Sequence, residues 1–269
     1  MELNMTPNEM HPSEFAYAFA FAKVEDIVGW GAEPFLPPGT DGTAWATEGA
    51  ERLLAAGLLV GTPGQGLNFT EEMTSTILAL VDPAIVFLAQ RKAGDGMQKL
   101  TIHLAGDDLV GLTRDADGMF ELTRYGDLTA AVAACATFVG ASLTERDTET
   151  RIDTSLEALT GLKTRVRAGD TAGAVAALVA SGAASPEATS AAHALASPVA
   201  SGVLSVLYCV NNVVEMTETF SVITNADDHS WIIFAPGSLN GPMILERSSV
   251  GALTARVAVG VVARLATPG

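Results

Sequence analysis

The spacing of apolar and polar positions changes character repeatedly along the chain. Up to Pro83 the pattern is typical of helices bounded by capping residues and by Pro/Gly loops. After Pro83, short apolar runs alternate with turn-forming stretches such as "KAGDG" and "DADG", as in antiparallel strands. The helical pattern returns near residue 153, and strands follow again after Pro198. The pattern therefore predicts helices, then strands, then a closing helix, and predicts this order twice.

The expected helices have recognisable boundaries. They cover residues 13–31, 43–59, 71–80, 128–141, 155–169, 170–182, 185–196 and 249–266. Ser13 and Ser185 are assigned as N-caps, because a serine hydroxyl accepts a hydrogen bond from an early helix amide. The aromatic residues of "FAYAFAFA" alternate as in a strand, but the N-cap before them and the charged residues behind them favour a helix. Gly57 is expected to close the second helix, and "GTPGQG" at 61–66 to form a loop.

Strands are expected in two sets of four. They cover residues 84–90, 98–105, 108–114, 118–124, 202–210, 214–223, 230–235 and 242–247. Asn211 and Asn212 fit a two-residue hairpin turn between the first two strands of the second set. Helices that are segregated from antiparallel strands predict an α+β fold. We expect one joined central sheet with helices at its face and ends.

The two halves of the chain match in order and in local sequence. Gly57 and Gly182 each follow an Ala/Leu-rich helix, and Pro83 and Pro198 each precede a first strand. This agreement predicts an internally duplicated, pseudo-two-fold central antiparallel sheet with flanking helical bundles. The alternative is chance similarity among Ala-rich segments. The predicted parts are a first repeat half at 13–142, a linker at 143–152 and a second repeat half at 153–265, most simply as one joined domain.

Composition narrows the functional classes. Of the 269 residues 48% are hydrophobic but only 6% are aromatic, so a sizeable core has to be built mainly from Ala, Val and Leu. The formal net charge of −16 repels phosphates and releases no counterions. Nucleic acid is therefore not an expected partner.

Cysteine usage and the N-terminal sequence indicate the compartment. Cys135 and Cys209 lie in apolar stretches without a CxxC spacing and are expected to be buried thiols, with a disulfide as the alternative. The N-terminus lacks a basic segment followed by an apolar core, and no run of about 18 apolar residues occurs. We therefore expect a soluble, cytoplasmic protein without membrane insertion.

No catalytic constellation stands out in the sequence. The four histidines, His11, His103, His193 and His229, are scattered singly, without the spacing of a metal site. "GTPGQG" has the glycine content of a phosphate loop but no following lysine, and no GxSxG elbow presents a serine nucleophile. We therefore expect a protein that is not an enzyme and that uses no catalytic residues, no metal and no cofactor.

Binding surfaces remain as the candidate functional features. The Ala-rich helices between residues 169 and 195 let other helices approach closely. This property suits either an internal bundle or a groove for a partner helix. The hairpin tips at 91–98 and 211–214 are the other exposed elements that the pattern predicts.

Two long segments carry a resemblance to a known family. They are "AERLLAAGLLVGTPGQGLNFTEEMTSTILALVDPAIVFLA" in the first half and "LVASGAASPEATSAAHALASPVASGVLSVL" in the second. Together with the strands and terminal helix after each, this helix–Gly–helix–Pro–strand layout resembles the EspG proteins, chaperones of type VII (ESX) secretion. The resemblance spans roughly residues 13–265 and is one of layout. It implies a quasi-two-fold α+β fold and binding of the helical tip of a PE–PPE pair.

The resemblance also implies where a partner would bind. The matching regions are the hairpin tip 91–98 and the helices at 153–195. The residues expected to contact a helical, PE–PPE-like partner are Arg91, Lys92, Asp95, Met97, Gln98, Leu178 and Val179. The expected function is a non-catalytic chaperone or adaptor; the alternatives are a self-associating scaffold subunit of the same fold, or a small-molecule binder between the two halves.

Overall fold

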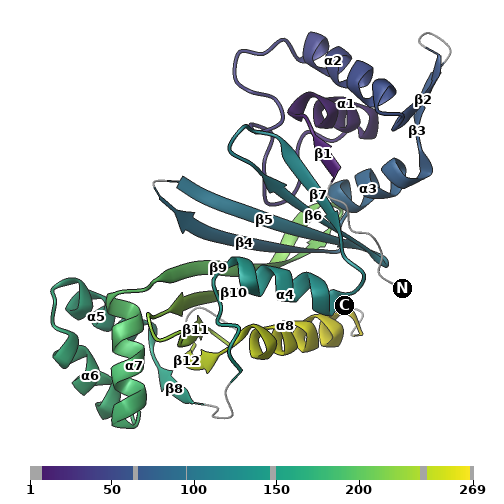
Figure 1. Cartoon of the computed structure of the whole chain (residues 1–269). Coiled ribbons are helices and arrows are strands. Elements are labelled where there is room, and N and C mark those ends of the chain that lie inside the picture. The colour runs from purple at the N-terminus through teal and green to yellow at the C-terminus, as the bar shows by residue number, and fades with distance from the viewer. Residues whose placement is uncertain (1–7, 63–65, 95, 146–149, 237–240, 267–269) are drawn as a thin grey trace. The chain divides into compact units, whose positions relative to one another are not determined.

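The fold is given by a computed structural model that describes residues 8–62, 66–94, 96–145, 150–236 and 241–266. Within these residues it has eight helices, one ten-stranded sheet and one two-stranded sheet (Figure 1). The predicted α+β class with a central antiparallel sheet is confirmed. The chain divides into two compact units. The first is Met1–Leu88, Lys99–Ala131 and Val206–Thr217, and the second is Ala89–Gln98, Val132–Ser205 and Glu218–Gly269.

The main sheet contains all the strands that the sequence pattern predicts. Its strands are β1 Asn8–Met10, β4 Ile85–Ala93, β5 Gly96–Ala105, β6 Asp108–Arg114, β7 Phe120–Arg124, β8 Arg151–Thr154, β9 Ala200–Val210, β10 Val213–Thr224, β11 Ser230–Phe234 and β12 Met243–Ser248. They lie in the order β1-β7-β6-β5-β4-β9-β10-β11-β12-β8. Ile102 faces Gly111 across β5 and β6, and Ile232 faces Glu246 across β11 and β12, both in antiparallel register. The sheet ends at the short strands β1 and β8, which limits pairing with other sheets.

Asn211 and Asn212 form the predicted turn between β9 and β10. Their φ angles are 50° and 60°, in the left-handed region that a type I′ hairpin turn needs at both central positions. Asparagine enters this region more easily than most residues with a side chain. The dipeptide therefore sets the register of the hairpin.

The first helix, α1 (Pro12–Ala22), settles the conflict in the alternating aromatic stretch. Phe15 and Phe19 are one helical turn apart and are both buried, so the helix places them on one face. The N-cap is His11 and not the predicted Ser13, because the Nδ1 atom of His11 accepts the Ser13 N–H at 3.2 Å. The proline at the first helical position has no N–H to satisfy, which favours this earlier start.

An aromatic cluster forms the centre of the first unit. Phe35 and Phe120 stack with ring centroids 4.7 Å apart, and Phe15 lies 5.1 Å from each of them. α1 ends at Ala22, followed by the C-cap Lys23 with φ 58°, and not at the predicted residue 31. The non-helical chain after α1 can therefore place Phe35 in this cluster. Aromatic pairs there stabilise the fold beyond the effect of burying apolar surface.

The predicted loop at 61–66 overlaps a small hairpin. β2 (Leu59–Thr62) and β3 (Gly66–Phe69) pair antiparallel, with Leu59 opposite Phe69 and both side chains buried. The helix before it, α2 (Gly42–Ala55), ends short of the predicted residue 59, and Gly57 has φ 72°, as its capping role requires. The third helix of the first unit is α3 (Glu71–Val81).

The remaining helices belong wholly or mainly to the second unit. They are α4 Leu128–Phe138, α5 Leu156–Arg167, α6 Thr171–Ala180, α7 Ser185–Ala196 and α8 Val250–Leu265. The predicted N-cap Ser185 is instead the first residue of α7, and Ala184 precedes the helix as a cap without a side-chain hydrogen bond. A proline in the first turn of α7 compensates for this weak start, because its φ is already helical.

Both ends of the predicted linker 143–152 take part in the fold of the second unit. At one end, the Glu145 carboxylate accepts hydrogen bonds from the Ser249 hydroxyl at 2.8 Å and the Gly251 N–H at 3.2 Å. This carboxylate lies at the positive end of α8 and stabilises its first turn. At the other end, β8 (Arg151–Thr154) pairs with β12.

The order of elements repeats along the chain. The series α3, β4, β5, β6, β7, α4 has the same succession of helix and strand as α7, β9, β10, β11, β12, α8. Within the main sheet the two sets of strands lie in mirrored order on either side of the β4–β9 pair. The predicted duplication, with its boundaries at 13–142, 143–152 and 153–265, fits this order and stays a prediction.

A buried histidine is the main pH-sensitive group of the first unit. His103 on β5 is fully buried, and its Nε2 atom lies 3.0 Å from Thr101 Oγ1, which also accepts the Trp30 indole N–H at 2.7 Å. Burial lowers the pKa of His103 from 6.5 to about 3, because a charged imidazolium would lose its hydration there. The folded protein therefore holds this imidazole in its neutral form.

We predict that His103 makes the protein less stable at acidic pH. Because its folded pKa is depressed, its stabilising contribution is complete above about pH 6.5 and is lost as the pH falls toward 3. The free energy of unfolding, measured with urea, should fall by about 2 kcal/mol more in the wild type than in His103→Leu when the pH is lowered from about 7.5 to about 5. The exposed His193 supplies the control, since His193→Gln should lose as much as the wild type. An equal loss in His103→Leu would contradict this account.

Candidate partner-binding surface

The hairpin between β4 and β5 carries most of the predicted contact residues. We call its tip, residues 91–98, the β4–β5 arm. Ile85, Val86, Phe87 and Ala89 of β4 are buried, whereas its outer part is partly buried at Gln90, Arg91 and Ala93 and exposed at Lys92. Gly94 turns the chain with φ 57°, a conformation that glycine adopts without strain. The arm therefore extends past the buried part of the sheet.

The Arg91 side chain is committed to contacts within the protein. Its Nε donates to Gln98 Oε1 at 2.8 Å, and one terminal nitrogen donates to the Phe138 carbonyl at 3.4 Å. The guanidinium also lies 4.8 Å from the centre of the Phe138 ring, within the range of a cation–π interaction. These contacts tie the two strands of the arm to each other and to the end of α4.

Lys92 and Met97 of the arm face solvent. The Lys92 side chain is exposed, and Met97 is 64% exposed. Asp95, which was also predicted to contact a partner, lies outside the described residues. The arm thus presents one cation and one flexible apolar side chain, a combination suited to an apolar contact with a charged rim.

The second candidate element is the bundle of α5, α6 and α7. Ser155 and Asp170 begin α5 and α6 as N-caps, each accepting a hydrogen bond from an amide in the first turn. Small alanine side chains let the three helices pack closely around a shared core with the sheet. That core includes Leu159, Leu162, Ala174, Leu178, Ala188, Ala191 and Trp231. The bundle is therefore a packed structure, as one of the two sequence-based interpretations expects.

The α6 helix presents a surface without charge. Its sequence, "TAGAVAALVA", contains no charged residue, although one side of the helix is exposed. The exposed residues Ala172, Ala176, Val179 and Ala180 recur at helical spacing and form what we call the uncharged α6 face. Val179 is its largest member and is 41% exposed. Soluble proteins usually cover such helix faces with polar side chains or with a partner.

Leu178 lies on the opposite side of the same helix. It is only 1% exposed and packs in the bundle core. Adjacent residues on a helix point about 100° apart, so Leu178 and Val179 cannot both face a partner. Leu178 supports the bundle, and Val179 is the member of the pair that lies on the surface.

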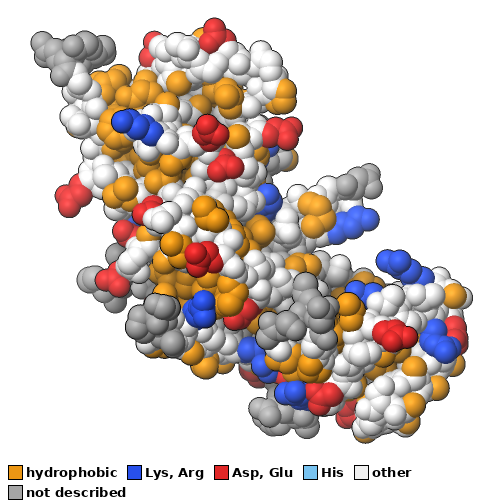
Figure 2. Space-filling model, turned by 180° about the vertical axis from the view of Figure 1, so that it is seen from behind, with side chains coloured by type: hydrophobic (Ala, Val, Ile, Leu, Met, Phe, Trp, Pro, Cys, Tyr) orange, Lys and Arg blue, Asp and Glu red, His pale blue; other side chains and the backbone are white. Residues whose placement is uncertain are grey.

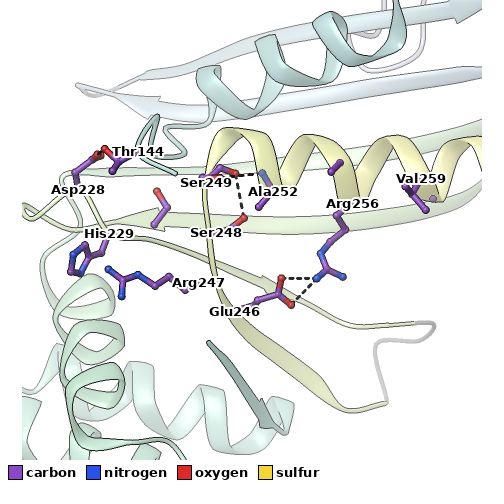
Figure 3. A pocket seen from close by; sticks show the side chains of 13 residues that line it. Thr144, Asp228, His229, Glu246, Arg247, Ser248, Ser249, Ala252, Arg256 and Val259 are labelled. Atoms are coloured by element: carbon purple, nitrogen blue, oxygen red, sulfur yellow. Dashed lines mark hydrogen bonds and ion pairs between the residues drawn. The ribbon is translucent and has the colours of Figure 1, made fainter. Parts of the chain in front are cut away.

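A pocket of about 590 Å³ lies in the same unit, between α8 and strands β11 and β12 (Figure 3). Arg256 and Glu246 point toward each other in it and form two hydrogen bonds of 2.6 and 2.7 Å. Arg256 also lies 4.6 Å from the centre of the Phe234 ring. Its guanidinium is therefore used to fasten α8 to the sheet.

The pocket is lined by two acidic and two basic side chains, and the polar contacts at its wall connect parts of the fold. Asp228 accepts hydrogen bonds at 2.7 Å from the hydroxyls of Ser142 and Thr144, and so fixes the start of the predicted linker. His229, directly before β11, has its Nδ1 3.1 Å from the Ser190 hydroxyl and thereby connects the start of β11 to α7. Sequence reasoning missed this pocket, because its walls come from separate segments of the chain and share no spacing or motif.

The other residues singled out for chemistry have structural roles where the structure shows contacts. Cys135 and Cys209 are free and buried, as predicted, and burial raises the pKa of both thiols. His11 caps α1 and His193 is exposed on α7. Among the described residues, no group of three or more His, Cys, Asp or Glu side chains is arranged to hold a metal ion.

Among the comparisons with known proteins, the one with solved structures is informative. No family model matches the chain, and no curated protein sequence does. Among solved structures, the chain is similar to "the Mycobacterium tuberculosis type VII secretion system chaperone EspG5 in complex with PE25-PPE41 dimer", with a TM-score of 0.65. The match covers 94% of this chain and 95% of that one at 11% identity. The chain has the EspG5 fold.

A fold like that of the EspG proteins was expected from the layout of the sequence, and the likeness to EspG5 confirms that expectation for the fold. At 11% identity it establishes the fold alone. None of the helices in the described part of the chain combines the length and the hydropathy that a membrane span needs. That the arm and the bundle bind a partner stays a prediction, for which the geometry above supplies the candidate residues.

We predict that adjacent residues of α6 differ sharply in their effect on stability. Leu178→Ala should lower the free energy of unfolding by about 2–5 kcal/mol, because it leaves a cavity in the bundle core. Val179→Ala should change it by less than about 1 kcal/mol, because the side chain is half exposed. Urea unfolding followed by circular dichroism measures both. Similar losses for the two variants would contradict this assignment of the buried and exposed sides.

Proposed function

We propose that the chain is a non-catalytic chaperone or adaptor of type VII secretion that binds a helical, PE–PPE-like partner. In this role it covers an apolar surface of the partner until secretion and releases the partner chemically unchanged. The β4–β5 arm and the uncharged α6 face are the proposed contact elements. The site of action in this proposal is the cytoplasm.

The observation that carries the proposal is the extent of the structural likeness. EspG5 is named as a type VII secretion system chaperone and was solved in complex with a PE25–PPE41 dimer. The match takes in 94% of this chain and 95% of that one, so the likeness concerns the fold as a whole and not one segment. Because a shared fold hosts different functions, the proposal also needs support from the surface itself.

The α6 face supplies that local support. Its exposed side chains are apolar or small, and Val179 is 41% exposed. The helix contains no charged residue, so no charged group has to lose its hydration when this face is covered. Burial of such a face against a partner helix is favourable by about 25 cal/mol for each Å² of apolar surface removed from water.

The proposed mechanism is reversible burial and not bond chemistry. A partner's apolar tip is covered by the α6 face and by Met97, while polar groups at the rim give specificity. The packed core beneath the face, including Leu178, keeps the surface rigid, so that little ordering entropy is lost on binding. Release then requires only competition or a change in the partner.

We predict that Val179→Asp weakens partner capture without unfolding the bundle. A buried carboxylate without a partner opposes apolar contact, so the affinity should fall by at least about tenfold. The measurement is a pull-down of the tagged, full-length chain from its native host, with mass spectrometry of what is retained. The wild type should retain a small helical pair at near-equal stoichiometry.

A matched control separates charge from position. Thr74 is exposed on α3 in the first unit, and Thr74→Asp adds the same charge outside the proposed surface. This variant should capture the partner as well as the wild type does. Recovery of the wild-type chain alone would overturn the proposed function, and equal capture by Val179→Asp would remove the α6 face from it.

A further inference from the structure

The β4–β5 arm has two faces with different chemistry. Side chains alternate between the two faces of a strand, so Arg91 and Lys92 point to opposite sides of the hairpin, as do Met97 and Gln98. The hydrogen bond between Arg91 and Gln98 places these two residues on the same face. Lys92 and Met97 therefore share the other face.

The face with Arg91 is closed by α4. Gly202 of β9 lies so close to this helix that an added Cβ would be 2.7 Å from Val139 Cβ and 2.8 Å from the Gln90 carbonyl oxygen. The missing side chain lets the end of α4 rest directly on the sheet at the base of the arm. Phe138 is thereby positioned under the Arg91 guanidinium, 4.8 Å from ring centre to guanidinium carbon.

This contact holds an element that would otherwise be poorly supported. An isolated two-stranded hairpin is marginally stable in water, and the arm extends past the buried part of β4. Arg91 joins both strands through Gln98 and joins them to α4 through Phe138. Its planar guanidinium can stack and donate at the same time, which a lysine cannot do.

The face with Lys92 is open. Lys92 forms no hydrogen bond or ion pair with any residue that the structure describes, and Met97 beside it is 64% exposed. The chain has 31 acidic residues against 15 basic ones, so a cation such as Lys92 belongs to the minority among its charged side chains. In Figure 2 the arm projects on the right with blue and orange side chains at its end.

We propose that Arg91 positions the arm, and that Lys92 and Met97 form its binding face for a helical segment bearing a carboxylate beside an apolar residue. The carboxylate pairs with Lys92 and the apolar residue packs on Met97. This inference rests on the proposed function and deepens it by naming the chemistry of the partner. The net charge of −16 would by itself repel an acidic segment. A preference for a carboxylate therefore has to come from the local charge of Lys92.

The positioning role of Arg91 is tested without any partner. In hydrogen exchange followed by mass spectrometry, Arg91→Ala should speed exchange of the 91–98 amides by about tenfold or more, with unchanged exchange in α8. Arg91→Lys should behave like Arg91→Ala, because charge alone does not replace the stacked, forked contact. Lys92→Glu should leave arm exchange as in the wild type. Unchanged exchange in Arg91→Ala overturns the positioning role.

The binding face is tested with two synthetic helical hairpins. Both carry the same Leu/Val tip, and they differ only in four flanking residues, which are Glu in one probe and Gln in the other. The wild type should bind the Glu probe about fivefold more tightly at about 50 mM salt, and the preference should vanish at about 500 mM. Lys92→Glu should abolish the preference for the Glu probe. Met97→Gln should lower the affinity for both probes by the same factor.

A control variant changes the net charge by the same amount elsewhere. Lys23 is exposed in the first unit, and Lys23→Glu should keep the preference for the Glu probe. Equal binding of the two probes by the wild type, including no binding of either, overturns the binding face. Capture of a native pair together with equal probe binding would reject this inference and leave the proposed function standing. Absence of a native pair would reject the proposed function whatever the arm exchange shows.

Discussion

Backbone hydrogen bonding in the main sheet is the constraint on which the described part of the structure depends. Every buried amide needs a partner, and the chain meets this need with antiparallel neighbours from β1 to β8. Helices then cover the sheet, and each half closes its strand series with one, α4 and α8. Where β4 and β5 run past the buried residues, the backbone is still paired but no longer covered. Arg91 supplies the missing support there, so a side-chain contact extends the sheet into solvent as an arm.

The succession of elements could be predicted because it depends on local chemistry. Pro83 and Pro198 cannot continue a helix, and they mark the passage from helix to strand in both halves. Asn211 and Asn212 adopt the left-handed angles that their turn requires. The short strands β1, β2, β3 and β8 were missed, because segments of three or four residues carry little periodic signal and are fixed by pairing with other segments. The N-caps of α1 and α7 were placed two residues and one residue too late. Pro12 already starts α1 before Ser13, and Ser185 is itself the first residue of α7, followed by a proline.

The candidate surface could be predicted only in outline. The "KAGDG" turn located the arm, and the Ala-rich sequence located the bundle. Which side of α6 faces water depends on how three helices pack, so the sequence alone did not distinguish Leu178 from Val179. The role of Arg91 depends on the end of α4 lying across Gly202, a contact between segments far apart in the chain. The pocket beside α8 could not be predicted for the same reason, and its Arg256–Glu246 pair fastens the helix to the sheet.

The account's central claim is that the arm and the α6 face together form the surface that holds a helical partner. Its most direct test is the footprint of the captured partner in hydrogen exchange, measured on the full chain with and without the retained pair. The account predicts slower exchange in residues 91–98 and in α6, with no change in α8 or at the Asn211–Asn212 turn. Protection of α8 around Arg256, with unchanged exchange in the arm and α6, would contradict it and move the binding surface to the pocket.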